Sequence, residues 1–261
     1  MKRLLASQIT RALLNKRWVL VFLLAALSFT YGHAQLAPSL GDSSLGALTI
    51  WQLILLRGYY GFFAALMAAL PFADSFSREK REGLLTSILL RADYRSYLFA
   101  KFLAIALSGI AAVLLPAFLL LVVCLIAYPS GPIRLPDLCF FLPLNRNLIP
   151  AAACSNPVPG SYLLLSLVFL GLFGSTYAAL AMAASLVSKH SIPVFATPIL
   201  LYAFGYYILP ASIRLNWLIS TEAALIPAGN LFAALVQYLV AVLLTGFAWL
   251  AFRKKERQVL S

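Results

Sequence analysis

The chain has 261 residues, of which 62% are hydrophobic and only 11% are charged, and its mean hydropathy is +0.92. Soluble domains contain roughly 45–50% apolar residues, so this composition excludes a soluble globular protein and indicates an integral membrane protein. The formal net charge of +12 is not gathered on a soluble module, which argues against nucleic-acid binding and fits the Lys and Arg excess of cytoplasmic loops in membrane proteins.

The first seventeen residues are basic and amphipathic. Leu5, Ile9 and Leu13 repeat every four residues and form one apolar stripe, and Arg11 is one of five basic residues here. Such a helix lies in the headgroup region with its basic side chains toward anionic lipid. We expect an interfacial helix, and a solvated basic tail is the alternative. The apolar run that follows has no A-x-A cleavage site close to its end, so we interpret it as a retained span.

Six apolar segments are candidates for membrane spans, each of which needs about 20 apolar residues. They cover residues 18–31, 50–72, 101–127, 161–187, 192–209 and 230–252. The first is short and must borrow flanking residues, and Pro116 predicts a kink in the third. The fourth carries a strip of small residues that favours close helix packing. This strip consists of Gly171, Gly174, Ser175, Ala178, Ala179 and Ala181.

The loops on the predicted outer side contain few basic residues. Residues 33–49 have no Lys or Arg, and residues 128–160 contain seven prolines. Residues 210–229 predict a helix or re-entrant pair near the outer face. Arg57 lies within the second span, where it either snorkels to the interface or faces a polar path.

Sixteen Lys and Arg residues fall in the predicted inner segments against four outside or at the outer edge. We therefore expect both termini in the cytoplasm.

A polar segment, residues 72–103, separates the second and third spans and holds six of the 20 Lys/Arg and four of the eight Asp/Glu. Gly83 suits the left-handed position that ends a helix, and Asp93 suits the N-cap of a helix starting at Tyr94. Between them, residues 84–90 form a short apolar stretch. This stretch either lies on the bilayer or its own chain, or it docks into a groove of a cytoplasmic protein.

This segment resembles the type-2 ATP-binding-cassette (ABC-2 type) exporter permeases. The resemblance lies in acidic residues followed by Gly, a Leu-rich stretch, and then Tyr-Leu and Lys at the head of a span. The matching residues are Glu79, Glu82, Gly83, Leu84, Leu85, Leu89, Leu90, Asp93 to Ser96, Tyr97, Leu98 and Lys101. One departure is Leu84, where the family often has Thr.

The resemblance implies an all-α membrane protein in which residues 1–261 form a single transmembrane permease domain. It implies six transmembrane helices, an N-terminal interfacial elbow helix, a cytoplasmic coupling helix in the first inner loop and an outer re-entrant segment before the last span. The expected location is a bacterial cell membrane. The positions implied in coupling to a partner are Glu79, Glu82, Gly83, Leu84, Leu85, Ile88 and Leu89. Those of the elbow helix are Leu5, Ile9, Arg11 and Leu13.

The same resemblance implies a partner that supplies the energy. The chain would form the translocation path as a dimer with a second permease copy or a paralogue, coupled to a separate cytoplasmic ABC ATPase that binds ATP and Mg. The chain has no G-x-x-x-x-G-K-[ST] phosphate loop, which agrees with an ATPase on another polypeptide. The apolar and aromatic interior favours a peptide, antimicrobial, lipid or hydrophobic drug as substrate.

Two other functions stay open from the sequence. The chain could be a membrane scaffold or assembly factor that docks a non-ATPase partner, or a secondary transporter. A secondary transporter usually has ionisable groups near the midplane, and Arg57 is the single candidate. The cysteines Cys124, Cys139 and Cys154 have no metal-site spacing, and a disulfide between the last two is undecided. We expect no enzyme activity, no catalytic residue, no metal and no cofactor in this chain.

Overall fold

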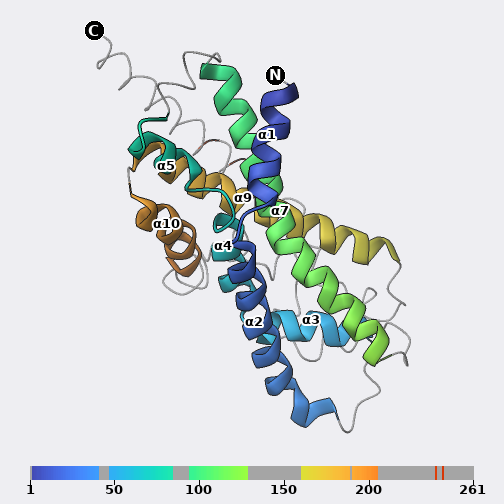
Figure 1. Cartoon of the computed structure of the whole chain (residues 1–261). Helices are drawn as coiled ribbons and strands as arrows, with labels where there is room; N and C mark the ends of the chain where they lie inside the picture. Colours follow the sequence, from blue (N-terminus) through green and yellow to red (C-terminus); the bar gives the residue numbers. More distant parts are fainter. Residues whose placement is uncertain are drawn as a thin grey trace.

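The computed structural model describes residues 2–40, 47–84, 94–128, 160–188 and 190–204, together with 239 and 243. Regular structure in these ranges is helical throughout (Figure 1), which confirms the all-α prediction for them. Most of the expected sixth span and the whole expected re-entrant segment at 210–229 lie outside the described residues. So do Asp93, Cys139 and Cys154.

Eight helices have defined bounds in the described ranges. They are α1 (Lys2–Leu13), α2 (Trp18–Leu40), α3 (Ala47–Arg57), α4 (Tyr60–Ala69), α5 (Ser75–Arg81), α7 (Tyr94–Ala127), α9 (Gly160–Val187) and α10 (Ser191–Ala203). Three of them contain stretches long and apolar enough to cross a membrane, namely Trp18–Pro38, Ser96–Ala127 and Leu170–Val187. The pair α3–α4 makes a fourth if it is counted as one bent span.

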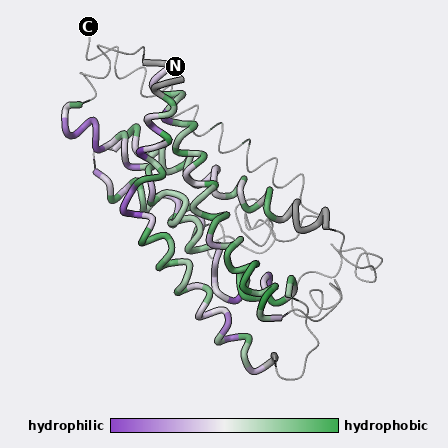
Figure 2. The backbone as a smooth tube through the Cα atoms, turned by 45° about the vertical axis from the view of Figure 1, so that its right-hand side comes forward, coloured by the Kyte–Doolittle hydropathy of each residue, from purple (hydrophilic) through white to green (hydrophobic). Residues whose placement is uncertain are grey.

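Several predicted helix limits agree with these bounds. The first span begins at Trp18 as expected and extends to Leu40, so the short apolar run does borrow residues at its C-terminal end. The helix predicted to start at Tyr94 does so, and α7 continues through Pro116 to Ala127. Figure 2 shows that hydrophilic residues gather at the end of the bundle that holds the N-terminus, while much of α2 and α7 is hydrophobic.

Helices α7 and α9 pack closely because both have glycine at their crossing point. A Cβ atom added to Gly174 would lie 2.5 Å from the carbonyl oxygen of Gly109, and one added to Gly109 would lie 2.4 Å from Cβ of Ala178. No side chain fits into such spaces. The close packing predicted from the small residues of α9 is therefore confirmed.

The expected second span, residues 50–72, is not one straight helix. Helices α3 and α4 meet at an angle of 76°, with Tyr59 in the left-handed conformation at φ 51°. The backbone of α2 crosses at this break: a Cβ on Gly58 would lie 2.4 Å from the carbonyl oxygen of Ser28, and the Ser28 hydroxyl donates to the Gly58 carbonyl at 2.8 Å. The missing side chain at residue 58 lets α2 pack against the break.

Helix α7 holds both halves of the bent pair. The indole Nε1 of Trp51, on α3, donates to the carbonyl oxygen of Ala117 at 2.9 Å, and the hydroxyl of Tyr60, on α4, donates to that of Val113 at 2.6 Å. Both side chains are buried. Arg57 ends α3 and donates from Nη1 to the Gln35 carbonyl oxygen at 3.2 Å.

Candidate functional site

A buried ion pair joins α5 to the start of α7. Glu79 accepts hydrogen bonds from the ammonium group of Lys101 and from the hydroxyl of Tyr97, and Lys101 Nζ also lies 2.8 Å from the Tyr97 hydroxyl oxygen. Lys101 and Tyr97 are fully buried and Glu79 is 7% exposed. A buried charge needs a partner of opposite sign, so this contact fixes α5 against α7.

Aromatic rings surround the ammonium group of Lys101. Its Nζ lies 5.8 Å from the ring centroids of Phe72 and of Phe76, and 5.2 Å from that of Tyr97. Cations at this distance from a ring are attracted by its negative face. The lysine is thus held by the carboxylate and the rings together, at the end of α7 where its apolar stretch begins.

Arg11 brings α1 to the same carboxylate. Its Nη1 lies 3.6 Å from Oε1 of Glu79, and its side chain is 61% exposed. Helix α1 packs along α7 (Figure 1), with Gln8 and Ala12 buried and Leu13 half-exposed. Because the Arg11 side chain is exposed to solvent, this pair stabilises little by itself, so the packing of α1 on α7 is the main attachment.

A second pair joins the α1–α2 connection to the α4–α5 turn. The guanidinium group of Arg17 binds the Asp74 carboxylate through two hydrogen bonds, Nη1 to Oδ1 at 2.5 Å and Nη2 to Oδ2 at 2.9 Å. The amide Nδ2 of Asn15 donates to the carbonyl oxygen of Pro71 at 2.5 Å. Asp74 is 1% exposed, and its bidentate contact restrains the turn that precedes α5.

Helix α5 is also attached to the C-terminal end of α9. The hydroxyl of Ser77 lies 3.1 Å from the carbonyl oxygen of Ser185 and 2.9 Å from that of Ser188. The last carbonyl groups of a helix accept no hydrogen bond from the helix itself, so they need donors from elsewhere. We call residues Arg11, Arg17, Asp74, Ser77, Glu79, Tyr97 and Lys101 the α5 anchor, because they hold α5 to α1, the α1–α2 connection, α7 and α9.

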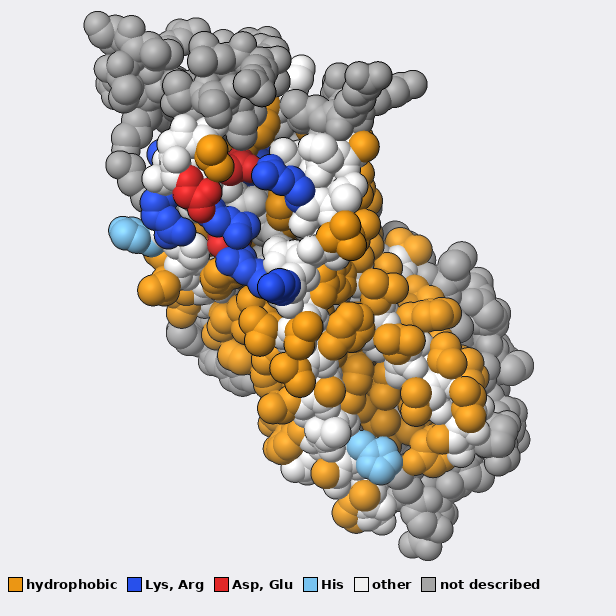
Figure 3. All heavy atoms as spheres, in the orientation of Figure 1, with side chains coloured by type: hydrophobic (Ala, Val, Ile, Leu, Met, Phe, Trp, Pro, Cys, Tyr) orange, Lys and Arg blue, Asp and Glu red, His pale blue; other side chains and the backbone are white. Residues whose placement is uncertain are grey.

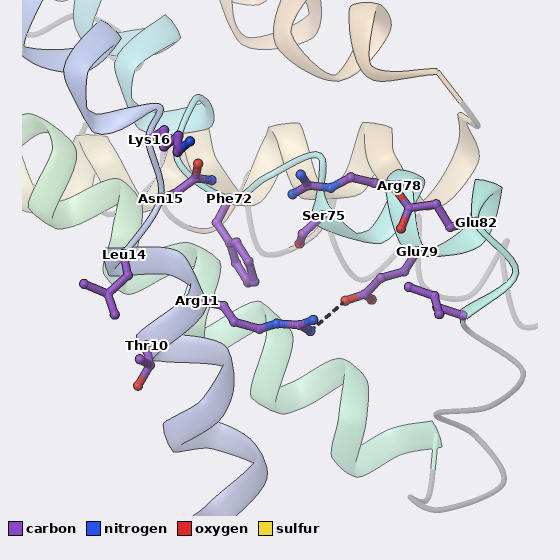
Figure 4. A pocket seen from close by; sticks show the side chains of 11 residues that line it. Thr10, Arg11, Leu14, Asn15, Lys16, Phe72, Ser75, Arg78, Glu79 and Glu82 are labelled. Atoms are coloured by element: carbon purple, nitrogen blue, oxygen red, sulfur yellow. Dashed lines mark ion pairs between the residues drawn. The ribbon is translucent and has the colours of Figure 1, made fainter.

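A pocket of about 530 Å³ lies beside the α5 anchor, between α1 and α5 (Figure 4). Its lining combines polar and charged side chains with the apolar Leu14, Phe72 and Leu84. The lining residues are Thr10, Arg11, Leu14, Asn15, Lys16, Phe72, Ser75, Arg78, Glu79, Glu82 and Leu84. Basic and acidic side chains gather over this region of the surface, and the face below it is mainly hydrophobic (Figure 3).

The positions expected to couple to a partner divide into two groups. Glu79 is buried in the α5 anchor, so it serves as an internal contact. Glu82, Gly83 and Leu84 are exposed, and Gly83 has φ 71°, the left-handed value predicted for a residue that ends a helix. Leu85, Ile88 and Leu89 lie outside the described residues.

The positions expected in the interfacial helix all lie on α1 or its end. Leu5 and Ile9 are half-buried, whereas Arg11 and Leu13 are exposed. The face that packs on α7 is therefore centred between Gln8 and Ala12, and the apolar stripe is only partly covered by protein. The exposed part of the stripe fits the prediction of contact with lipid, which stays a prediction.

Sequence reasoning missed the partners within the α5 anchor. The sequence places Lys101 at the head of a span, but the resemblance gives its counter-charge Glu79 a role only toward a partner protein. A lysine inside an apolar helix is costly unless it is paired, and this signal pointed to a carboxylate from another helix. The pair of Arg17 with Asp74, 57 residues apart, had no comparable signal.

Comparison of the chain with protein-family models, with curated proteins and with solved structures finds no match. Among the described residues there is also no group of three or more His, Cys, Asp or Glu residues arranged to hold a metal ion. A function must therefore be argued from the residues of this chain and their contacts.

Replacing Asp74 by Asn should lower the free energy of unfolding by about 1–2 kcal/mol, because the bidentate pair with Arg17 is lost. The estimate is reduced for solvent screening, since the Arg17 side chain is 28% exposed. Thermal unfolding of the purified chain in mild detergent measures the change. The control is Glu82→Gln, which removes a nearby exposed carboxylate and should shift stability by less than about 0.5 kcal/mol. Equal effects of the two variants would contradict the role of Asp74.

Proposed function

We propose that this chain is the membrane permease subunit of an ATP-driven exporter of the ABC-2 type. It would form the translocation path as a dimer and would be coupled to a separate cytoplasmic ABC ATPase. The proposal rests on the motif resemblance in residues 79–101. The single structural observation that supports it most is the α5 anchor, because it connects α5, which precedes the exposed residues 82–84, to the apolar helices α7 and α9 and to α1.

The α5 anchor offers a mechanical route for such coupling. Gly83 and Leu84 stand exposed directly after α5, and α5 is bound to α7 through Lys101 and to α9 through the Ser77 hydroxyl. A force applied to residues 84–90 would therefore move α5 together with the ends of two candidate spans. Coupling of this kind requires two conformations of the helix bundle, one of which the partner binds more tightly than the other.

The partner can be identified by co-purification. The full chain, expressed with the proteins encoded beside it and solubilised in mild detergent, should retain a P-loop ATPase. The reconstituted complex should then hydrolyse ATP faster when a hydrophobic peptide or amphiphilic drug is added. Recovery of a stable partner without a phosphate loop would contradict the exporter proposal and favour a membrane scaffold.

Replacing Gly83 by Ala, or Glu82 by Gln, should reduce transport per ATP hydrolysed several-fold without preventing membrane insertion. A Cβ on Gly83 would meet nothing within 4 Å, so Gly83→Ala acts through the left-handed backbone alone, at a cost of about 1–2 kcal/mol for a non-glycine residue. Transport and ATP hydrolysis are measured together in proteoliposomes. Arg81→Gln, on the last residue of α5, is the matched control. Normal transport by both test variants would refute the coupling role.

A further inference from the structure

The pocket between α1 and α5 has the composition of an anion site. We propose that it binds the phosphate headgroup of an anionic phospholipid, with Arg11, Lys16 and Arg78 as its cations and the Ser75 hydroxyl as a further donor. This site needs no ATPase and no transported substrate. A test of this site is therefore independent of the exporter proposal.

The basic residues of the pocket come from two separate parts of the chain. Arg11 and Lys16 lie at the end of α1 and just after it, and Arg78 lies on α5. Neither Lys16 nor Arg78 forms an ion pair with another residue in the described part of the chain. Figure 4 shows the three side chains around one hollow, with Arg11 directed toward Glu79.

The two carboxylates in the pocket do not cancel this positive charge. Glu79 is already neutralised by the buried ammonium group of Lys101, which leaves Glu82 to face the three cations. Glu82, Arg11 and Lys16 are all exposed to solvent, so screening weakens both signs, and three cations still face one carboxylate. The pocket thus keeps a positive surplus that a phosphate group would balance.

Ser75 provides an independent indication of a ligand. Its residue is only 2% exposed, and its Oγ has no hydrogen-bond partner among the described residues. The side chain lines the pocket, where Figure 4 shows it between Phe72 and Arg78. A buried hydroxyl without a partner is unusual and costs free energy. A phosphate oxygen in the pocket would accept a hydrogen bond from this hydroxyl.

The surroundings of the pocket favour a lipid over a free phosphate ion. Lys16 lies two residues before Trp18, where the candidate span of α2 begins, so the pocket lies at the level where headgroups are expected. Leu14, which is 82% exposed, and Leu84, which is 44% exposed, form apolar parts of its lining. An acyl chain can cover these leucines, whereas inorganic phosphate cannot. A volume of about 530 Å³ is within the usual range for a small-molecule site.

The test uses the purified full chain in nanodiscs made of phosphatidylcholine alone or of phosphatidylcholine with phosphatidylglycerol. Native mass spectrometry of the released protein measures how much phosphatidylglycerol stays bound. The wild type should retain phosphatidylglycerol in preference to phosphatidylcholine. Lys16→Gln and Arg78→Gln should each weaken this retention about fivefold, as expected for one basic residue near an anionic lipid.

Ser75→Ala separates a specific site from general surface charge, because it leaves the charge unchanged. It should weaken phosphatidylglycerol retention several-fold while leaving the melting temperature in pure phosphatidylcholine equal to or above that of the wild type. Arg81→Gln is the matched control: it removes one positive charge from the same helix outside the pocket, and it should retain the lipid as the wild type does. Equal melting temperatures in phosphatidylcholine show that the variants are folded.

Three results would overturn the proposal. The first is equal retention of the two lipids by the wild type. The second is equal loss of phosphatidylglycerol in Arg81→Gln and Arg78→Gln, which would reduce the effect to general surface charge. The third is competition by millimolar inorganic phosphate that fully displaces the lipid, which would identify a site for the free anion.

Discussion

Replacing Glu79 by Gln is expected to lower the free energy of unfolding by about 3 kcal/mol, the largest stability effect that we anticipate for a single polar residue here. The variant leaves the ammonium group of Lys101 fully buried without its carboxylate. Glutamine can still accept the hydrogen bond from Tyr97, but it cannot balance the charge. Denaturant or thermal unfolding of the purified chain in mild detergent measures the difference.

The double variant Glu79→Gln with Lys101→Met provides the decisive control. It removes both charges, and methionine has nearly the volume of lysine among the rings of Phe72 and Phe76. Because the main cost of the single variant is an unpaired buried charge, the double variant should recover most of the lost stability. A single variant as stable as the wild type would show that this ion pair does not hold α5 to α7.

Replacing Gly174 by Ala is expected to lower the free energy of unfolding by about 2–3 kcal/mol through overpacking. The new Cβ would lie 2.5 Å from the carbonyl oxygen of Gly109 and 3.2 Å from a methyl carbon of Val113. The nearest atom belongs to backbone, so α7 and α9 would have to move apart. The same unfolding measurement records the effect.

Gly171→Ala is the matched control for this variant, on the same helix one turn earlier. Its Cβ would come no closer than 3.3 Å to any atom, and that atom is the flexible end of Leu114. The contact is relieved by a small shift of the leucine, and alanine favours the helix by roughly 0.5–1 kcal/mol over glycine. We expect a change close to zero. Similar losses in the two variants would show that helix contact at Gly174 is not the cause.

Features that depend on neighbours in the sequence were predictable. The start of α2 at Trp18 follows from the change between charged and apolar residues. The start of α7 at Tyr94 follows from the preference of Asp93 for an N-cap position. The left-handed Gly83 follows from its place after a charged helical stretch. The contact surface of α9 on α7 follows from its small residues, since only these permit backbones to approach.

Features that depend on another part of the chain were not predictable. Apart from Gln52 and Arg57, residues 50–72 are mainly apolar on both sides of Gly58, so their hydropathy does not predict the 76° bend. At the bend, the carbonyl oxygen of Gly58 accepts a hydrogen bond from the hydroxyl of Ser28, which lies 30 residues earlier in the chain. The α5 anchor likewise combines residues from distant segments. The expected six spans and the apolar stretch at 84–90 remain predictions.

The bent pair α3–α4 has a consequence for the order in which the protein is made. With 11 and 10 residues, each half is about 15 Å long, half of the ~30 Å hydrocarbon layer. The backbone carbonyls that accept the hydrogen bonds of Trp51 and Tyr60 belong to α7, 66 and 53 residues further along the chain. Neither half is long enough to cross the bilayer alone. The α7 carbonyl groups to which they bind are synthesised later. We therefore expect the segment to reach its final position only after α7 has been synthesised.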